Sequence, residues 1–198
     1  MDQIRHLVRE TLSDAWYTLY RYTYEYLRSD GRWDRQQREA YDRGNGAAVL
    51  LYDPDRRMVL LTRQFRLPIY INDHPDGHLL EVCAGVLEGD DPEACMRREI
   101  LEETGYEVPR LDKVAEVYSS PGAVTEKLHL FQASYAPGMK VASGGGVVEE
   151  TEDIELLEWS YEQVQSAMAQ GEIQDAKTLI LLQHAALYGP LRQEYYSQ

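Results

Sequence analysis

Three glutamates, Glu99, Glu102 and Glu103, lie close together in a segment that the sequence predicts to be helical. At about 100° per residue, their side chains share an arc of roughly 100° on that helix. Like charges 4 Å apart repel by about 1 kcal/mol even in bulk water, so such a cluster opposes folding unless something offsets it. In most proteins an acidic stripe is only a solvated helix face. The alternative is that the carboxylates bind a hard cation such as Mg²⁺, which takes oxygen ligands together with substrate phosphates.

The helix that positions these carboxylates has clear boundaries. Asp90 or Asp91 can cap its start, and Pro92 fits the first turn, where a missing N–H costs nothing. Gly105 ends it. Arg98 lies beside the acidic stripe and can hold a carboxylate by a forked pair of hydrogen bonds. Four apolar side chains are expected to face a sheet: Ala94, Met96, Ile100 and Leu101.

The remaining pattern alternates between strands and helices. Runs rich in leucine and β-branched residues predict strands at 47–53, 58–66, 78–87, 113–120, 127–135 and 154–160. Helical periodicity predicts two further helices at 161–172 and 175–189. This order predicts a mixed α/β fold with helices on both faces of one sheet.

Residues 1–43 are of a different kind, because they are rich in tyrosine and tryptophan at alternating positions. That alternation predicts antiparallel strands, with a hairpin turn at 29–32 in which Gly31 can take a positive φ. A sheet this small is marginal on its own. We therefore expect it to pack on the rest of the chain or on a second subunit, and to be buried in a homodimer. Residues 44–46 are the expected hinge to the main domain.

Composition excludes several classes of protein. The chain has 198 residues, with 20 Lys and Arg against 34 Asp and Glu, which gives a net charge of −14. So acidic a surface argues against general binding of nucleic acid. The longest apolar run is too short to span a bilayer, and the start of the chain has no secretory pattern. Two cysteines without a CxxC spacing make no disulfide framework, so the cytoplasm is the expected location.

The helix segment resembles the signature of the Nudix superfamily. That signature is G-x5-E-x7-R-E-U-x-E-E-x-G-U, in which U is a bulky apolar residue, and residues 98–106 match its second half at every position. The first half departs from the pattern. Four residues instead of five separate Gly85 from the acidic position, and Asp90 stands there in place of Glu.

The similarity extends from about residue 12 to residue 188 and includes the bacterial GDP-mannose pyrophosphatases of this superfamily, which share the shortened loop. The resemblance implies a Nudix α/β/α sandwich with a mixed sheet at 44–198. It implies an N-terminal β-sheet region at 1–43 that forms a homodimer. It also implies Mg²⁺-dependent hydrolysis of GDP-mannose to GMP and mannose 1-phosphate, with Mn²⁺ as an expected substitute for Mg²⁺.

The resemblance also implies the metal ligands. They are the carboxylates of Glu99 and Glu103, the backbone carbonyl of Ala84 and one carboxylate from the loop before 154–160, while Glu102 is a ligand or lies next to one. Aligning backwards from the strand selects Glu152 as that carboxylate and as the group that orients or deprotonates the attacking water. The loop is two residues longer than expected, so Glu149 and Glu150 are rivals. The alternative for this loop is a disordered acidic run, which is the usual meaning of such a segment. The implied catalytic residues are Glu152, Glu103 and Glu102.

Substrate contacts carry over from the resemblance as well. Arg66 and Lys177 are expected on phosphate oxygens, although a salt bridge at a strand end is an equal reading for Arg66. Trp16 is expected to stack on guanine, with packing of the small sheet as the alternative. The full implied set of substrate contacts is Trp16, Gln37, Arg38, Glu39, Arg66, Gly85, Glu126, Thr151 and Lys177.

Two other functions compete with this one. Nudix enzymes that hydrolyse ADP-ribose share the N-terminal sheet, and a proline after their signature resembles Pro121. A catalytically inactive Nudix binding module is the third hypothesis. It is disfavoured because such domains usually lose a signature carboxylate, and all three are present here.

Overall fold

The computed structural model describes residues 3–147 and 153–192 of the chain. These divide into two compact units. The first holds the residues up to Asn45 together with Tyr118–Lys127, and the second holds Gly46–Val117 and the residues from Leu128 onwards. Each unit is described by itself.

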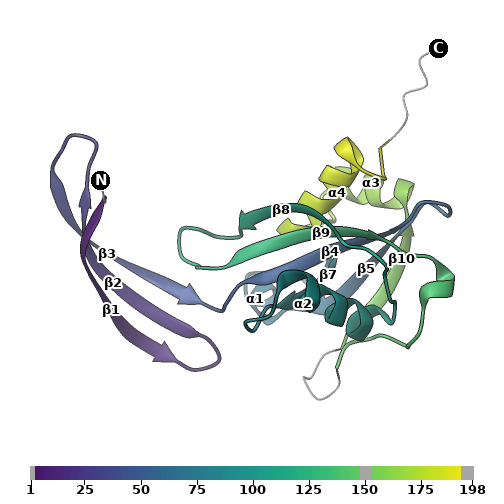
Figure 1. Ribbon diagram of the computed structural model, residues 1–198, viewed down its shortest axis with the longest axis horizontal. Coiled ribbons are helices and arrows are strands. Elements are labelled where there is room, and N and C mark those ends of the chain that lie inside the picture. Colours follow the sequence, from purple (N-terminus) through teal and green to yellow (C-terminus); the bar gives the residue numbers. More distant parts are fainter. Residues whose placement is uncertain (1–2, 148–152, 193–198) are drawn as a thin grey trace, which may run out of the picture. The chain divides into compact units, whose positions relative to one another are not determined.

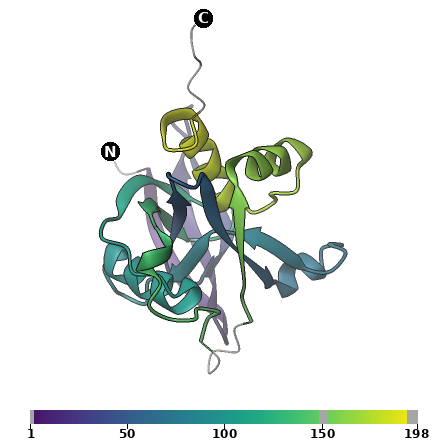
Figure 2. The same cartoon turned by 90° about the vertical axis from the view of Figure 1, so that its right-hand side faces the viewer.

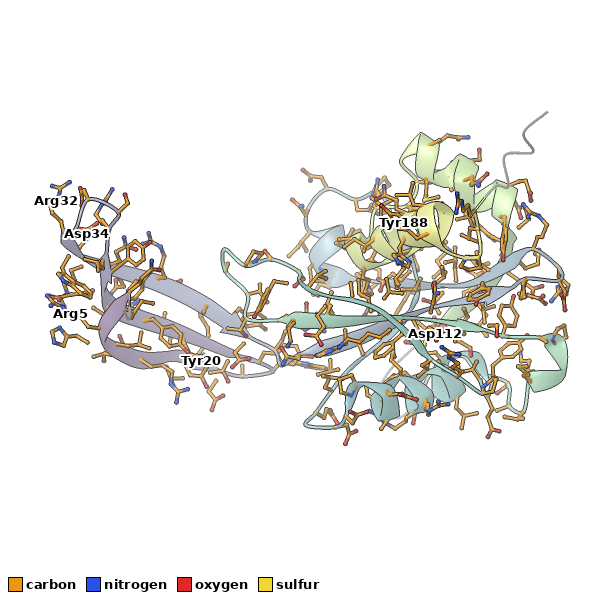
Figure 3. The ribbon with its side chains drawn as sticks, turned by 45° about the horizontal axis from the view of Figure 1, so that its top comes forward. Arg5, Tyr20, Arg32, Asp34, Asp112 and Tyr188 are labelled. Carbon is orange, nitrogen blue, oxygen red and sulfur yellow. The ribbon has the colours of Figure 1, made fainter. Side chains whose placement is uncertain are left out.

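The first unit is a three-stranded antiparallel sheet in the order β1-β2-β3, as the alternation of aromatic residues predicts (Figure 1). Its strands are β1 (Ile4–Asp14), β2 (Thr18–Leu27) and β3 (Trp33–Asp42). The predicted hairpin turn is present, with Gly31 at a φ of 84°. Charged side chains such as Arg5, Arg32 and Asp34 gather at this end of the sheet (Figure 3). None of residues 3–45 is buried.

The second unit is built on a mixed sheet in the order β10-β5-β4-β9-β8, to which β6 adds beside β5 and β7 beside β4. β4 pairs in parallel with β9 and antiparallel with β5 and β7. The strands are β4 (Gly46–Asp53), β5 (Met58–Phe65), β6 (His78–Glu81), β7 (Cys83–Val86), β8 (Asp112–Tyr118), β9 (Lys127–Ser134) and β10 (Glu155–Ser160).

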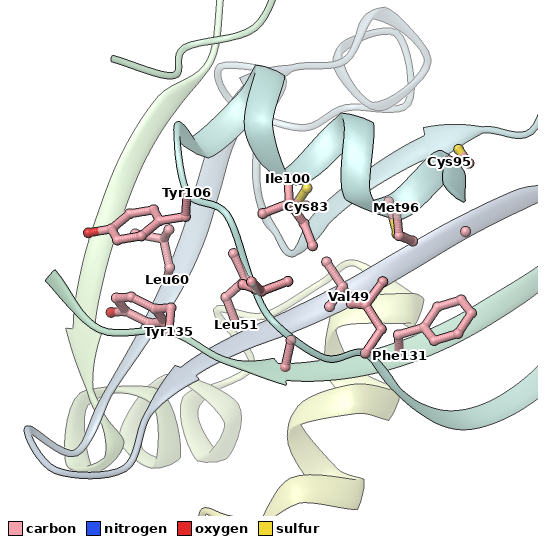
Figure 4. Close-up of a cluster of buried hydrophobic side chains, with 14 of the residues drawn as sticks. Val49, Leu51, Leu60, Cys83, Cys95, Met96, Ile100, Tyr106, Phe131 and Tyr135 are labelled. Carbon is pink, nitrogen blue, oxygen red and sulfur yellow. The ribbon is translucent and has the colours of Figure 1, made fainter. Parts of the chain in front are cut away.

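Strand β4 divides the core between the two faces of this sheet. Its alternate residues Ala47, Val49 and Leu51 pack into one apolar cluster, which Figure 4 shows beneath the helix α2 (Pro92–Glu99). The residues between them, Ala48 and Leu50, belong to a second cluster with α3 (Tyr161–Gln170) and α4 (Ala176–Tyr188). Helices therefore cover both faces, as predicted and as Figure 2 shows.

One predicted strand is two in the structure. Residues 78–87 divide into β6 and β7 at Val82. The N–H of Val82 donates to the hydroxyl of Thr178 at 2.8 Å, instead of to a carbonyl of a neighbouring strand. β6 then pairs with β5 and β7 with β4, so the expectation of one continuous strand is wrong. Two short helices, α1 (Leu67–Tyr70) and the 3₁₀ turn Pro137–Met139, were not expected. No helix within the described residues is long and apolar enough to cross a membrane.

Candidate active site

The segment that carries Glu99, Glu102 and Glu103 begins as an α-helix and ends as a π-helix. α2 begins after Asp91, whose carboxylate accepts from the N–H groups of Glu93 and Ala94 at 3.0 and 3.3 Å. After Glu99 the chain continues as a π-helix, Ile100–Thr104, and Gly105 ends it. Short π-helical turns are rare and occur often at functional sites.

The face that this helix turns to the sheet differs from the expected one. Cys95, Met96 and Ile100 are buried, whereas Ala94 and Leu101 are exposed. The prediction for Ala94 and Leu101 is therefore wrong, because at about 100° per residue they lie far around the helix from Met96 and Ile100.

The corrected face includes two of the three glutamates. On the same helical wheel, Glu99 and Glu103 fall between Cys95 and Ile100. Their burial agrees, since the Glu99 side chain is 12% exposed and Glu103 is 5% exposed, against 34% for the Glu102 side chain. The acidic stripe is therefore not simply a solvated face.

The Glu99 carboxylate lies directly against strand β7. A Cβ added to Gly85 would lie 2.2 Å from Cδ of Glu99, so only glycine leaves room for this approach. Ala84, the neighbour of Gly85, is paired with Ala48 of β4, and no strand among the described residues pairs with the other edge of β7. Two carboxylates therefore face a strand with an open edge.

Arg98 holds the exposed side of the cluster. Its Nη1 lies 3.1 Å from Oε1 of Glu99 and 3.4 Å from Oε2 of Glu102, and its Nη2 lies 3.8 Å from Asp90. On the buried side, burial first and the Glu103 carboxylate second raise the pKa of the Cys83 thiol well above its usual value. The carboxylates are thus fixed between a cation and a neutral thiol.

The donor chemistry of this cluster fits a hard divalent cation. Carboxylate and carbonyl oxygens are the ligands that Mg²⁺ takes in proteins, together with substrate phosphates. Among residues 3–147 and 153–192, no three His, Cys, Asp or Glu side chains come together as a metal centre. The predicted third carboxylate, Glu152, lies outside the described residues, as do its rivals Glu149 and Glu150 and the predicted substrate contact Thr151.

The loop that leads toward those residues is fastened to the π-helix. The N–H of Gly145 donates to the carbonyl of Glu103 at 2.7 Å, and the N–H of Gly146 donates to the carbonyl of Glu102 at 3.1 Å. The last turn of the helix therefore uses two of its carbonyls to hold residues that precede the acidic run.

The two predicted phosphate-binding cations converge on a residue that the sequence did not identify, Glu81. Arg66 donates to both oxygens of this carboxylate, from Nε and Nη2, at 2.9 Å each. Lys177 donates from Nζ to Glu81 at 2.8 Å and to Asp175 at 2.9 Å. In the sequence, Glu81 is a single acidic residue within an apolar strand pattern. This signal alone does not show whether the residue belongs to a functional site or is simply exposed to solvent.

The charges of this second cluster determine its protonation. Burial by itself would raise the pKa of Glu81, but the hydrogen bonds and charges of Arg66 and Lys177 lower that pKa to about 2. Burial would likewise lower the pKa of Lys177, and the facing carboxylates of Glu81 and Asp175 raise it instead. Glu81 and Lys177 are therefore both ionised at neutral pH.

The other predicted substrate contacts belong to the first unit. Trp16 is 84% exposed and stands edge-on to Tyr17, so packing within the sheet does not bury it. Glu126 is buried and accepts from the Ser119 hydroxyl at 2.8 Å, with Arg43 at 3.5 Å. Three further contacts are exposed on β3: Gln37, Arg38 and Glu39.

The strand geometry separates these last three residues. Successive side chains of a strand point to opposite faces, so Gln37 and Glu39 share one face and Arg38 lies on the other. Gln37 donates to Thr23 at 3.2 Å, and Glu39 lies 3.7 Å from Arg21. The structure brings Ala84, Gly85, Glu99 and Glu103 together, and it gathers Arg66 with Lys177 through Glu81.

Two family models match the chain. The GDP-mannose pyrophosphatase NudK N-terminal domain matches residues 3–41, and the NUDIX domain matches residues 42–182.

Bacterial proteins match along almost the full chain. A GDP-mannose pyrophosphatase of Cronobacter sakazakii is 50% identical over 178 residues, which cover 90% of this chain and 92% of the relative. One of Yersinia enterocolitica is 46% identical over 190 residues, 96% and 98% of the two chains. One of Escherichia coli is 47% identical over 182 residues, 92% and 94% of the two chains. On these matches the chain belongs to the NUDIX family and, within it, to the group of the GDP-mannose pyrophosphatases.

Proposed function

We propose that this chain hydrolyses the pyrophosphate bond of GDP-mannose, giving GMP and mannose 1-phosphate, with Mg²⁺ as its metal. The close relatives named above carry this activity in their names. The observation in the structure that supports it best is the pair of carboxylates, Glu99 and Glu103, set against the open strand β7.

Members of the NUDIX family generally use a divalent metal ion. In this chain the proposed ligands are Glu99, Glu103 and the Ala84 carbonyl, with Glu152 from the following loop. When bound, Mg²⁺ or a substituting Mn²⁺ neutralises phosphate charge and makes a water molecule more acidic. Arg98 keeps Glu99 and Glu102 in place from the solvent side.

The chain's own cations bind the diphosphate in this proposal. Arg66 and Lys177 donate hydrogen bonds to phosphate oxygens, whose negative charge grows as the bond to the leaving group breaks. Glu152 holds the attacking water and accepts its proton, with Glu149 and Glu150 as rivals for that role. Glu102 and Glu103 support this step by fixing the ligand set.

The nucleoside and the sugar are assigned to the remaining predicted contacts. Trp16 offers an exposed aromatic face for guanine. The buried, hydrogen-bonded carboxylate of Glu126 is suited to a hydroxyl of the substrate. Five further proposed contacts are Gln37, Arg38, Glu39, Gly85 and Thr151.

Substrate profiling tests the choice of substrate. Purified protein with Mg²⁺ is given GDP-mannose, GDP-glucose and ADP-ribose at equal concentrations, and products are separated by chromatography. The proposal expects GMP and mannose 1-phosphate to form fastest. Equal or faster turnover of ADP-ribose would replace it with the competing hypothesis.

Replacement of Glu103 tests the proposed ligand set. Glu103→Gln removes a charge with little change in shape, so kcat should fall at least about a hundredfold while the fold stays intact. Glu107→Gln is the matched control, because Glu107 is exposed four residues further on. An unchanged rate in Glu103→Gln would contradict the assignment, and a wild type without activity would favour the inactive binding module.

We propose further that the first unit forms a homodimer. Its sheet has no buried residue between 3 and 45, and it exposes apolar side chains such as Leu7 and Val8, at 59% and 62%. A sheet of three strands is marginal without a partner surface. Sedimentation at micromolar concentration should show a dimer, and a monomer under these conditions would contradict the proposal.

A further inference from the structure

Glu81 joins the two cations that the proposed function assigns to phosphate. Its side chain is 3% exposed and accepts three hydrogen bonds, two from Arg66 and one from Lys177, at 2.8–2.9 Å. A carboxylate has about four acceptor positions, so this one is nearly saturated. It is therefore not available to bind a metal ion or substrate itself.

Its partners, in contrast, keep donors to spare. A guanidinium has five N–H donors, of which Arg66 uses two on Glu81, and an ammonium has three, of which Lys177 uses one on Glu81 and one on Asp175. Both cations are held at one end and can still donate to an anion. Held donors of this kind bind an anion without losing further side-chain freedom.

The two cations could not be kept together without an anion between them. The Lys177 side chain is 15% exposed, and burial disfavours a charged amine. Two like charges near each other in a partly buried site repel strongly, since the effective dielectric constant there is below that of water. Glu81 lies between the two cations and offsets this repulsion, and it keeps Lys177 charged together with Asp175.

The position of Glu81 in the chain ties this cluster to the metal ligands. Glu81 ends β6, and Ala84, the proposed carbonyl ligand, lies three residues later in β7. The segment between them is fixed by the hydrogen bond from the Val82 N–H to the Thr178 hydroxyl. Thr178 in turn donates from its own N–H and hydroxyl to the carboxylate of Asp175. The hydrogen bond from Val82 holds the backbone of this segment without using the Glu81 carboxylate, so the Ala84 carbonyl should keep its place when that carboxylate is changed.

We propose that Glu81 is a positioning residue, which holds Arg66 and Lys177 together and aims them at the diphosphate of the substrate. The proposal rests on the function proposed above. Glu81 acts through its two partners and does not touch substrate or metal.

The first experiment compares Glu81→Gln with Glu81→Asp in the full-length protein. In Glu81→Gln, kcat/KM should fall about 30-fold, mostly through a higher KM, because the cations lose their alignment in the ground state as well. Glu81→Asp keeps the charge and should recover part of the loss. The Mg²⁺ concentration for half-maximal activity should stay as in wild type, unlike in Glu103→Gln.

A matched control separates positioning from stability. Glu158 also pairs with an arginine, Arg56, through both oxygens, and it accepts from the Tyr135 hydroxyl at 2.7 Å. Glu158→Gln should lower thermal stability and leave kcat/KM unchanged. An equal loss of kcat/KM in the two Gln variants would overturn the proposal.

A mutant cycle that combines the three substitutions is the decisive test. Adding Glu81→Gln to Arg66→Ala and Lys177→Ala should cost less than about twofold more in kcat/KM, because its partners are already gone. If the fold-losses in kcat/KM multiply instead, Glu81 has a role that does not depend on these two cations, and the inference is overturned. If Glu81→Gln does not fold, Glu81→Asp takes its place in the cycle.

The cycle is run on whichever nucleotide diphosphate sugar the wild type hydrolyses best. Failure on GDP-mannose alone then counts against the proposed substrate, while the result of the cycle still decides the role of Glu81.

Discussion

The two units contain sheets that are stabilised in different ways. In the second unit, β4 is buried along almost its whole length and contributes to two apolar clusters. In the first unit, no residue between 3 and 45 is buried, and the strands are joined by backbone pairing and by exposed ion pairs such as Arg5–Glu25 at 2.6 Å. Exposed ion pairs contribute little to stability. Regular strand pairing is therefore no sign that a sheet is stable by itself.

The charges differ in the same way. In the second unit, Glu81 and Glu103 are buried and each is placed where it can act on a ligand or on a neighbour. In the first unit, the paired charges of β1–β3 remain in solvent. This contrast predicts that substitutions of the buried charges in the second unit change chemistry and that substitutions on the exposed apolar surface of β1 change association.

The largest effect is expected for Gly85→Ala. The new Cβ would meet the Glu99 carboxyl at 2.2 Å, and the strand on one side and the helix on the other leave little room for relaxation. Activity should fall at least about a hundredfold with the fold retained. Gly138→Ala is the control, since a Cβ there meets nothing within 4 Å. Equal steady-state rates for the two variants would mean that the approach of Glu99 to β7 does not matter.

Acid should weaken the second unit through Glu81. Because its pKa is near 2 in the folded protein and about 4.5 in the unfolded chain, it contributes stability above pH 4.5 and loses it as the pH falls toward 2. Between these values the difference in unfolding free energy between wild type and Glu81→Gln should shrink by about 3 kcal/mol.

Denaturant titrations at several pH values measure this difference. Glu25→Gln is the comparison in the first unit. The pKa of the Glu25 carboxylate is also lowered, chiefly by the hydrogen bond from Arg5. Because this pair is exposed to solvent, its effect on the free energy of unfolding should be much smaller. A difference for Glu81→Gln that is independent of pH would contradict the low pKa.

Association should respond to the first unit only. Val8→Asp places a charge on the exposed apolar surface of β1 and should weaken the proposed dimer by roughly tenfold. Leu187→Asp on α4 is the matched control, because Leu187 is 61% exposed and Val8 is 62% exposed. Sedimentation over a concentration series distinguishes them, and equal weakening in both would remove the contrast between the units.

The smallest effect is expected for Arg98→Ala. Arg98 orients Glu99 and Glu102 from a side chain that is 41% exposed, so water can replace part of its role. We expect kcat/KM to fall about fivefold, with a higher Mg²⁺ requirement. Arg97→Ala is the control, since Arg97 is equally exposed and pairs with Glu93 instead. A metal requirement that changes equally in both variants would argue against the orienting role.

Local patterns predicted most elements but not their partners. The strands, the helices on both faces and the boundaries of the carboxylate helix follow from periodicity, capping residues and glycine positions. The break at Val82 could not be predicted, because the hydroxyl that takes its N–H comes from Thr178, 96 positions later. The missed short helix α1 has a proline at its second position and spans only four residues, too few for a periodic signal.

The site was predictable to a similar degree. Fixed spacing identified Glu99, Glu102 and Glu103. Ala94 and Leu101 were assigned to the buried face because they are apolar, but their angular position around the helix decides which face they occupy. Glu81 was missed because its role depends on Arg66 and Lys177, which meet it only in the fold. Whether the assigned contacts bind substrate stays a prediction.

The attachment of residues 145 and 146 to the π-helix has a consequence for how such enzymes diverge. Gly145 and Gly146 are fastened to the carbonyls of Glu103 and Glu102, and the N–H of Ile154 returns to the carbonyl of Gly145 at 3.4 Å. An insertion or deletion between these two anchor points leaves both of them in place. Homologues can therefore change the number of residues there, and with it the acidic side chain proposed to act on water, without rebuilding the helix that carries Glu99 and Glu103.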